Sequence, residues 1–282
     1  MSRNNLERMG APPSEASPPA MAKEGSPHLA FATPTMFVDL PSKGLFYPEG
    51  HPLHNVDQVE IRFMTAKEED ILTSQSLLKK GVAIDRMLQS VIINKSIKLT
   101  DMLVGDKNAL IIAARISGFG ADYAVEITCP SCGEQGEHSF DLDEVGTNSW
   151  EDFEDLEIER SDNGRFTVTT PRTNTKVELR LLVGEDEKYL AQLAASKKKK
   201  KLPETTMTDQ LRRVITAVNG DSNRSLIESF INNAPAIDTR YIRGVYKKVV
   251  PNIDLKQEYA CPNCGFDSEM EVPLTAKFFW AE

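Results

Sequence analysis

Four cysteines are the residues whose type and spacing most clearly indicate chemistry. They form two Cys-Pro-x-Cys-Gly units, Cys129 with Cys132 and Cys261 with Cys264, and the chain has no other cysteine. Zinc binds four thiolates in a tetrahedral shell, and a gap of two residues allows both sulfurs of one turn to reach the same ion. The pattern therefore predicts one structural Zn²⁺ ion that is held by all four cysteines.

Other uses of these cysteines are open. Paired Cys-x-x-Cys units also occur as redox-active dithiols, but thioredoxin-like pairs precede a helix, whereas these lie in expected hairpin turns. Disulfides or unliganded thiols are a further alternative. A catalytic zinc is disfavoured, because four thiolates leave no open coordination position. For the same reason His138, although near the first pair in sequence, is not expected to be a ligand.

The segments on both sides of each cysteine pair alternate between apolar and polar residues. Tyr123, Val125 and Ile127 lead into the first pair, residues 257–259 lead into the second, and residues 270–274 follow it. A period of two predicts strands, so each pair is expected in the turn of a β-hairpin. Two hairpins that are distant in sequence would then form one zinc-ribbon-like β module.

Helical patterns occur before and after the first hairpin. Thr65 followed by Glu68 is a capping-box signature for a helix start, and Gly81 is placed to end that helix. Further helices are expected at 84–93 and 109–116. These elements form the first of two helical blocks.

The second helical block is expected over residues 186–252. Leu211, Val214, Ile215 and Val218 recur at helical spacing. The five lysines at 197–201 are interpreted as a solvated loop between helices, although such a run also suits an acidic partner or a phosphate backbone. Two helical blocks beside a β module indicate the α+β class.

The sequence divides into six parts by composition and pattern. Residues 1–34 are rich in Pro, Ser, Ala and Gly, which is typical of disorder. The expected parts are a disordered N-terminal tail at 1–34, an extended surface arm at 35–54, a helical block at 55–120, the β module with the first zinc hairpin at 121–185, the second helical block at 186–252, and the second zinc hairpin with an aromatic C-terminus at 253–282.

Two apolar features are candidate interface elements. Large aromatic side chains often anchor protein contacts, and these occur in a Pro- and Gly-rich arm and at a chain end. The alternative is that they cover the core of this chain. The candidate residues are Phe37, Leu45, Phe46 and Tyr47 in the arm and Phe278, Phe279 and Trp280 at the C-terminus.

Composition and missing motifs exclude several classes of protein. The net charge of −9 and the acids beside the cysteine turns (Glu134, Glu137, Asp267, Glu269) disfavour nucleic acid as a partner. The apolar runs are far shorter than the roughly 20 residues that span a bilayer, and no secretory signal precedes them. The chain has no Gly-rich phosphate loop, nucleophile elbow or His-Glu-x-x-His helix, so no enzyme is expected.

Several stretches together resemble a known family. These are LPSKGLFYP at 40–48, MTAKEEDIL at 64–72, the two cysteine turns, and VPLTAKFFW at 272–280. They are similar to the baseplate hub and hub assembly proteins of T-even-type contractile-tailed bacteriophages. The resemblance covers the chain from about residue 36 to its end.

The resemblance implies a non-enzymatic role in building the central hub of the phage tail baseplate. The partners would be other baseplate or hub proteins, and the protein would act in the host cytoplasm during assembly or remain in the virion tail. It implies no catalytic residues. Two rival functions remain from the residues themselves: a nucleic-acid-binding zinc ribbon and a metal-dependent hydrolase.

Overall fold

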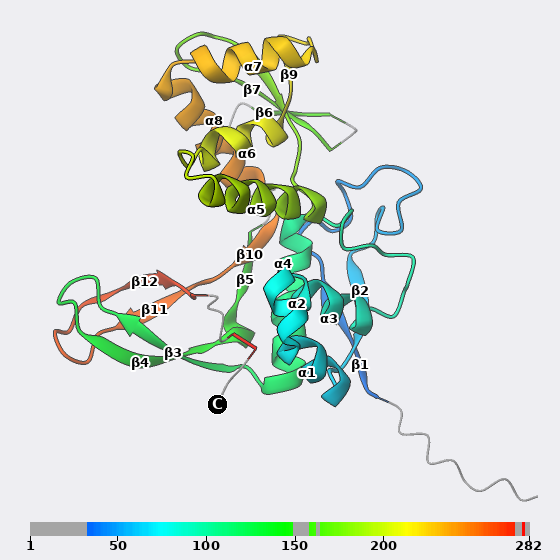
Figure 1. Cartoon of the computed structure of the whole chain (residues 1–282), viewed down its shortest axis with the longest axis vertical. Helices are drawn as coiled ribbons and strands as arrows, with labels where there is room; N and C mark the ends of the chain where they lie inside the picture. The colour runs from blue at the N-terminus through cyan, green and yellow to red at the C-terminus, as the bar shows by residue number, and fades with distance from the viewer. Residues whose placement is uncertain (1–32, 149–157, 162–163, 274–277, 280–282) are drawn as a thin grey trace, which may run out of the picture. The chain divides into compact units, whose positions relative to one another are not determined.

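The structure is a computed structural model that describes residues 33–148, 158–161, 164–273 and 278–279 (Figure 1). Helices and small antiparallel sheets make up these residues, which confirms the mixed helix and sheet composition. Residues 1–32 of the predicted tail, most of the acid-rich segment 151–162, and Trp280 lie outside the described residues. Within the described part, no helix is both long and apolar enough to cross a membrane.

The predicted arm begins as a strand. β1 (Thr35–Asp39) pairs with β2 (Gln58–Arg62) in antiparallel register, with Val38 opposite Val59. Turns rather than a helix follow β1, as expected from the Pro and Gly residues. The segment does not simply lie on the surface, however, because strand pairing and turns direct several of its apolar side chains into the hydrophobic core.

Four helices follow this hairpin. The Thr65–Glu68 capping box is present, and Gly81 ends the helical region with a φ of 66°, so both predictions are confirmed. The expected single helix breaks at Ser74, whose backbone is extended. The helices are α1 (Ala66–Thr73), α2 (Gln75–Lys80), α3 (Ala83–Val91) and α4 (Val104–Phe119).

The first cysteine hairpin comes directly after α4. β3 (Asp122–Thr128) pairs with β4 (Gln135–Asp141), as the alternating pattern predicts. A 3₁₀ turn (Leu142–Glu144) leads to the short β5 (Gly146–Asn148). β5 pairs with a strand near the other end of the chain, β10 (Asn252–Asp254).

The second part of the chain contains a four-stranded antiparallel sheet in the order β6-β7-β8-β9 and four helices. The strands are β6 (Ile158–Arg160), β7 (Phe166–Thr169), β8 (Lys176–Leu179) and β9 (Ile215–Val218). The helices are α5 (Gly184–Lys199), α6 (Thr206–Val214), α7 (Arg224–Asn233) and α8 (Ala236–Val249).

The helical prediction for Ile215 and Val218 is wrong. α6 ends at Val214, and the next residues form β9, where Ile215 lies opposite Leu179 of β8. The spacing of the apolar residues does suit a helix, but the open edge of β8 offers the backbone hydrogen-bonding partners. Tertiary pairing therefore overrides the local pattern.

Only the last two of the five lysines at 197–201 lie in the connection between helices. Residues 197–199 are the last turn of α5, and residues 200–201 form the following turn. Lysines at this end stabilise a helix, because its C-terminus carries a partial negative charge. Lys197 also forms an ion pair with Asp209 at the start of α6. The run therefore has a structural role in ending one helix and contacting the next.

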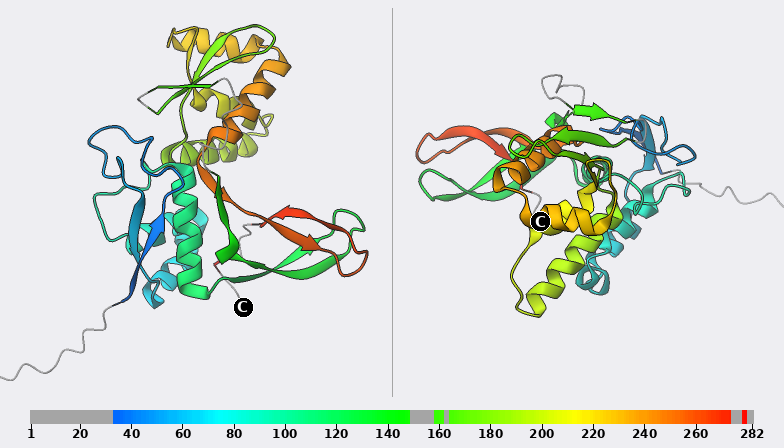
Figure 2. Two further views of the ribbon diagram at one scale, coloured as in Figure 1. Left: turned by 180° about the vertical axis from the view of Figure 1, so that it is seen from behind. Right: turned by 90° about the horizontal axis from the view of Figure 1, so that it is seen from above.

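The second cysteine hairpin consists of β11 (Lys256–Ala260) and β12 (Asp267–Glu271). Its register matches that of the first hairpin: Ala260 pairs with Asp267 just before its turn, as Thr128 pairs with Gln135. Figure 2 shows the two hairpins side by side from behind. The period-two prediction for both hairpins is confirmed.

The two parts of the chain repeat one set of elements, and we call residues 33–148 the first half and residues 158–273 the second half. Each half contains a strand hairpin, β1–β2 or β7–β8, that is followed by a helix, α1 or α5. The residue directly after a later helix, α3 or α6, then pairs with the second strand of that hairpin. Ile92 pairs with Ile61 in the first half, and Ile215 pairs with Leu179 in the second. A final helix and a cysteine hairpin complete each half.

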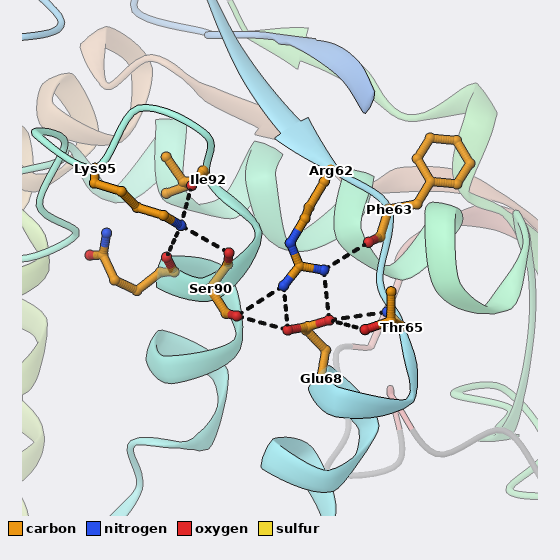
Figure 3. A network of polar contacts seen from close by, with 8 residues as sticks. Arg62, Phe63, Thr65, Glu68, Ser90, Ile92 and Lys95 are labelled. Carbon is orange, nitrogen blue, oxygen red and sulfur yellow. Dashed lines mark hydrogen bonds and ion pairs between the residues drawn. The ribbon is translucent and has the colours of Figure 1, made fainter. Parts of the chain in front are cut away.

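The start of the first helix in each half, α1 and α5, is held by the same kind of contact. In the first half Arg62 binds the buried Glu68 with both guanidinium ends, at 2.6 and 2.8 Å, and Ser90 adds a bond of 2.7 Å (Figure 3). In the second half Arg180 binds the buried Asp186 at 2.7 Å, and Arg213 donates to it at 2.8 Å.

A buried aspartate at the third position of the last helix also recurs. Asp106 of α4 accepts from the backbone N–H of Ser42 at 3.0 Å and from its hydroxyl at 2.6 Å. Asp238 of α8 accepts from the backbone N–H of Arg172 at 2.8 Å and from the hydroxyl of Thr173 at 2.8 Å. Each aspartate thus fixes the turn between the two hairpin strands of its own half.

Candidate metal centre

The four cysteine sulfurs converge although the two pairs are far apart in sequence. All four Sγ atoms lie within 4.8 Å of one another. Cys129 Sγ is 3.8 Å from Cys264 Sγ, and Cys132 Sγ is 3.8 Å from Cys261 Sγ. These distances exclude disulfides, whose S–S bonds are about 2.05 Å. The sequence prediction that the two turns meet is therefore confirmed.

The distances fit a tetrahedral metal shell. With Zn–S bonds of about 2.3 Å, the edges of a tetrahedron of sulfurs measure about 3.8 Å. The Cys129–Cys264 and Cys132–Cys261 sulfur pairs both have that separation. Four thiolates are the donor set of a closed structural site with no position left for a reacting water. The residues present therefore fit a structural ion of the zinc type.

The backbone of each turn is folded in the same way. The N–H of Cys129 donates to the carbonyl of Glu134 at 2.8 Å, and the N–H of Cys261 donates to that of Phe266 at 2.8 Å. Gly133 and Gly265 have φ values of 74° and 69°, a region that residues with a side chain rarely adopt. The glycine after each pair therefore allows the turn to close around its sulfurs.

Backbone amides favour the thiolate form of the first cysteine in each turn. N–H groups of Cys132 and then Ser131 lower the pKa of Cys129. In the second turn, N–H groups of Cys264 and Asn263 lower the pKa of Cys261 to about 6. A thiolate is the metal-binding form of cysteine, so both turns are prepared for a cation.

Cys264 shows the electrostatic cost of bringing the sulfurs together. The N–H of Phe266 lowers its pKa, but desolvation and the neighbouring thiols outweigh that bond and raise the pKa to about 11. Four negative sulfurs at this separation repel one another, and a divalent cation at their centre removes the repulsion. The arrangement therefore favours cation binding over four free thiols.

His138 is not part of the sulfur cluster. It lies half-buried on β4, and its ring packs edge-on against Phe140 and Tyr259, with ring centroids 4.6 and 5.2 Å apart. The potential metal ligands gathered here are the four cysteines alone among the described residues. His138 thus joins the two hairpins by packing.

The contacts between the hairpins are reciprocal. The first cysteine of each pair lies beside the second cysteine of the other pair. This pairing of the sulfurs is that of a two-fold symmetric interface, here formed within one chain. A further contact joins the hairpins from one side, since the side-chain amide of Gln257 bonds both the N–H and the carbonyl of Asp141.

The candidate interface residues lie mainly in the interior. Phe46, Tyr47, Phe278 and Phe279 are buried and belong to the hydrophobic core, as the alternative interpretation expects. Leu45 is half-buried, and Phe37 on β1 is 64% exposed. Phe37 is therefore the described candidate that offers a free aromatic surface.

Polar partners explain why two of these aromatics are held inside. The hydroxyl of Tyr47 donates to Asp106 at 2.7 Å and accepts from the N–H of Leu103 at 3.0 Å. The carbonyl of Phe278 accepts from Arg115 at 2.7 Å. Sequence reasoning missed both Asp106 and Arg115.

A signal for the repeated contacts was present in the sequence. Cys129 follows Asp106 at the same interval as Cys261 follows Asp238. A search for internal repeats aligned on the cysteine pairs finds this equality. The pairing of Arg62 with Glu68 and of Arg180 with Asp186 has equal spacing as well.

Comparisons with known proteins place the chain in a family. A family model described as T4 bacteriophage base plate protein matches residues 33–280. No curated protein and no solved structure matches. The matched region contains both halves and all four cysteines, and it agrees with the resemblance found in the sequence. The chain therefore belongs to the family of T4 bacteriophage base plate proteins.

Proposed function

We propose that this protein is a non-enzymatic structural or assembly protein of a contractile phage tail baseplate hub. It acts through contacts with other baseplate or hub proteins in the host cytoplasm or in the finished tail. The observation that carries the proposal is the family match over residues 33–280, which includes all of the described residues.

The second part of the proposal is that the four cysteines hold one structural Zn²⁺ ion. The sulfur–sulfur distances of 3.8 Å, the lowered pKa values of Cys129 and Cys261, and the closed four-thiolate shell support it. The same shell supports a non-enzymatic role, because a metal-dependent hydrolase needs an open coordination position.

The surface around the cysteine turns supports protein rather than nucleic acid as the partner. Glu134, Glu137, Asp267 and Glu269 are exposed on the two hairpins. Carboxylates at this position repel phosphate groups, and the net charge of the chain is −9. A gel shift with phage DNA at low salt is the check, and no shift is expected.

The proposal is tested with a phage that lacks this gene. Electron microscopy of infected-cell lysates should show no complete tails, because a hub protein is needed before the baseplate closes. A plasmid copy of the wild-type gene should restore tails. Mass spectrometry of the restored virions then separates the two roles, since a hub subunit is present in virions and an assembly factor is not. Normal tails without the gene would refute the proposal.

A further inference from the structure

The C-terminal aromatic residue Phe278 is anchored on the first half. Arg115 of α4 donates to the carbonyl of Phe278 at 2.7 Å, and its other nitrogens donate to the carbonyls of Gly120 at 2.8 Å and Asp122 at 3.3 Å. The ring of Phe278 packs edge-on against Tyr123, with centroids 5.1 Å apart. The anchoring site is therefore the junction between the end of α4 and the start of β3.

The second half contains the counterpart of this junction. Asp106 and Asp238 are both the third residue of their helices, and the cysteine turns follow them at the same interval. The two hairpins also share one register. Residues can therefore be matched one to one between the halves. The counterparts of Arg115, Gly120, Asp122 and Tyr123 are Lys247, Asn252, Asp254 and Leu255.

All four counterparts line one groove. It has a volume of about 450 Å³ and lies between α6, α8 and β10. The buried Leu211, Val214 and Ile242 lie at its base. The half-buried Val250 and Leu255 give it accessible apolar surface, and the charged Arg243 and Lys247 also line it. In the second half, the groove is thus lined by the counterparts of the residues that surround Phe278 in the first half.

The chain that follows each hairpin explains why one site is filled and the other is open. Gly146 and Thr147 are the counterparts of Phe278 and Phe279. Gly146 lies opposite Asp254 in the pairing of β5 with β10, and in the first half the carbonyls of Phe278 and Asp122 accept from the same side chain, Arg115. Neither glycine nor threonine carries an aromatic ring, so the groove keeps the space that rings fill in the first half.

The solvent exposure of Arg115 and Tyr123 and of their counterparts agrees with a filled site in the first half and an open one in the second. Arg115 is 1% exposed and Tyr123 is 3% exposed, beneath the C-terminal aromatics. Their counterparts Lys247 and Leu255 are exposed and half-buried, respectively. The cation and the apolar side chain that hold an aromatic segment in the first half are thus accessible in the second.

We propose that this groove binds an extended segment of a partner protein that presents two adjacent aromatic side chains. The rings would enter the groove beside Val250 and Leu255, and the exposed Lys247 would donate to a backbone carbonyl of the segment. The inference rests on the proposed function, in which the protein acts through contacts with other proteins. It adds the surface and the chemistry of the partner.

The test uses a fluorescent synthetic peptide with the sequence of residues 272–282, VPLTAKFFWAE, and the full-length protein. Fluorescence anisotropy should show saturable binding, and the same peptide with alanine in place of both phenylalanines should not bind. Val250→Trp, which fills the groove, is expected to weaken binding at least about tenfold. Lys247→Ala, a change of an exposed side chain, is expected to weaken it about threefold to tenfold.

Lys248→Ala is the matched control, because Lys248 is the exposed neighbour of Lys247 on α8 and does not line the groove. Circular dichroism melts verify that each variant is folded. Absence of saturable binding by the wild type would overturn the inference. The inference would also be overturned if Lys247→Ala and Val250→Trp bound the peptide as tightly as the wild type, since the peptide would then bind elsewhere. Neither outcome alters tail formation in the gene-deletion experiment, so the proposed function is judged separately.

Discussion

Glu68 and Asp186 are buried carboxylates, and each is bound by an arginine at the end of a strand of its own half: Arg62 is the last residue of β2, and Arg180 directly follows β8. Burial by itself would raise the pKa of Glu68, but hydrogen bonds from Arg62, Ser90 and Thr65 outweigh burial and lower the pKa to about 2. For Asp186, burial again raises the pKa, and the bonds from Arg180 and the N–H of Val183 lower it below its usual range. Both carboxylates therefore stabilise the fold in their charged form.

The stability of the protein should accordingly fall in acid through Glu68. Because its pKa is lower in the folded chain than in the unfolded chain, its contribution is complete above about pH 4.5 and is lost as the pH falls towards 2. The shift corresponds to on the order of 3 kcal/mol. Denaturant unfolding should show Glu68→Gln to be less stable than wild type at pH 7, with a gap that narrows below pH 4.5.

Glu69→Gln is the control for this experiment, because Glu69 lies in the same helical turn but is exposed. Its unfolding free energy should stay close to that of the wild type at every pH. A gap between Glu68→Gln and wild type that is constant from pH 7 to pH 3 would contradict the assigned role of the charge.

At the residue scale, the sequence predicted contacts between residues close in sequence better than contacts between residues far apart in sequence. The Thr65–Glu68 capping box was readable because both partners lie within one helical turn. The bonds of Glu68 to Arg62 and Ser90 were not, since they depend on how β2 and α3 pack around α1. The cysteine cluster was predictable despite its long separation, because a structural zinc site needs four ligands and the four cysteines form two matching pairs, whatever the path of the chain between them.

At the scale of elements, contacts between segments distant in sequence decide the secondary structure and the path of the chain where the local sequence pattern allows more than one. Residues 215–218 form β9 because β8 offers an unpaired edge, and the apolar spacing there suits either structure. The arm after β1 turns inward because Asp106 binds its backbone at Ser42. Neither partner is near in sequence, so composition and spacing could not reveal these outcomes.

The close packing of α4 against the chain before β10 can be tested with two helical glycines, one at a tight contact and one at an open position. A Cβ at Gly105 of α4 would lie 1.9 Å from the carbonyl oxygen of Pro251, whereas a Cβ at Gly244 of α8 would meet no atom within 4 Å. Gly105→Ala should therefore destabilise the protein by about 1–3 kcal/mol, because the strand region at β10 must move. Gly244→Ala should stabilise it by about 0.5–1 kcal/mol through its helix propensity.

Urea unfolding of both variants measures this difference directly. Neither glycine has a positive φ, so backbone conformation does not favour glycine at either position. If Gly105→Ala were as stable as Gly244→Ala, the packing of α4 against β10 would be refuted.

At the scale of the whole molecule, the two halves are joined by contacts that each half contributes equally. The cysteine turns supply two sulfurs each, and β5 of the first half pairs with β10 of the second. Loss of the metal would thus affect residues far apart in sequence. Metal binding of this kind couples directly to folding, because the unfolded chain offers no preformed site.

Removal of the ion should consequently loosen both cysteine hairpins together. Hydrogen exchange is expected to quicken in β3–β4 and in β11–β12 after treatment with a strong chelator, while the β6–β9 sheet stays protected. Elemental analysis should find one zinc per chain in the wild type and much less in Cys261→Ser, with Ser131→Ala as the control that retains the ion. Faster exchange in one hairpin alone would contradict a shared centre.

The division of the four sulfurs between distant turns also sets an order of events during synthesis. Ribosomes add about 5–20 residues per second, so Cys261 is made on the order of ten seconds after Cys132. Throughout that interval the nascent chain carries half of a coordination shell, and the thiols of Cys129 and Cys132 remain open to oxidants and to competing ions. Synthesis of the second cysteine hairpin supplies the other two sulfurs, so the shell is completed only after both halves of the chain have been made.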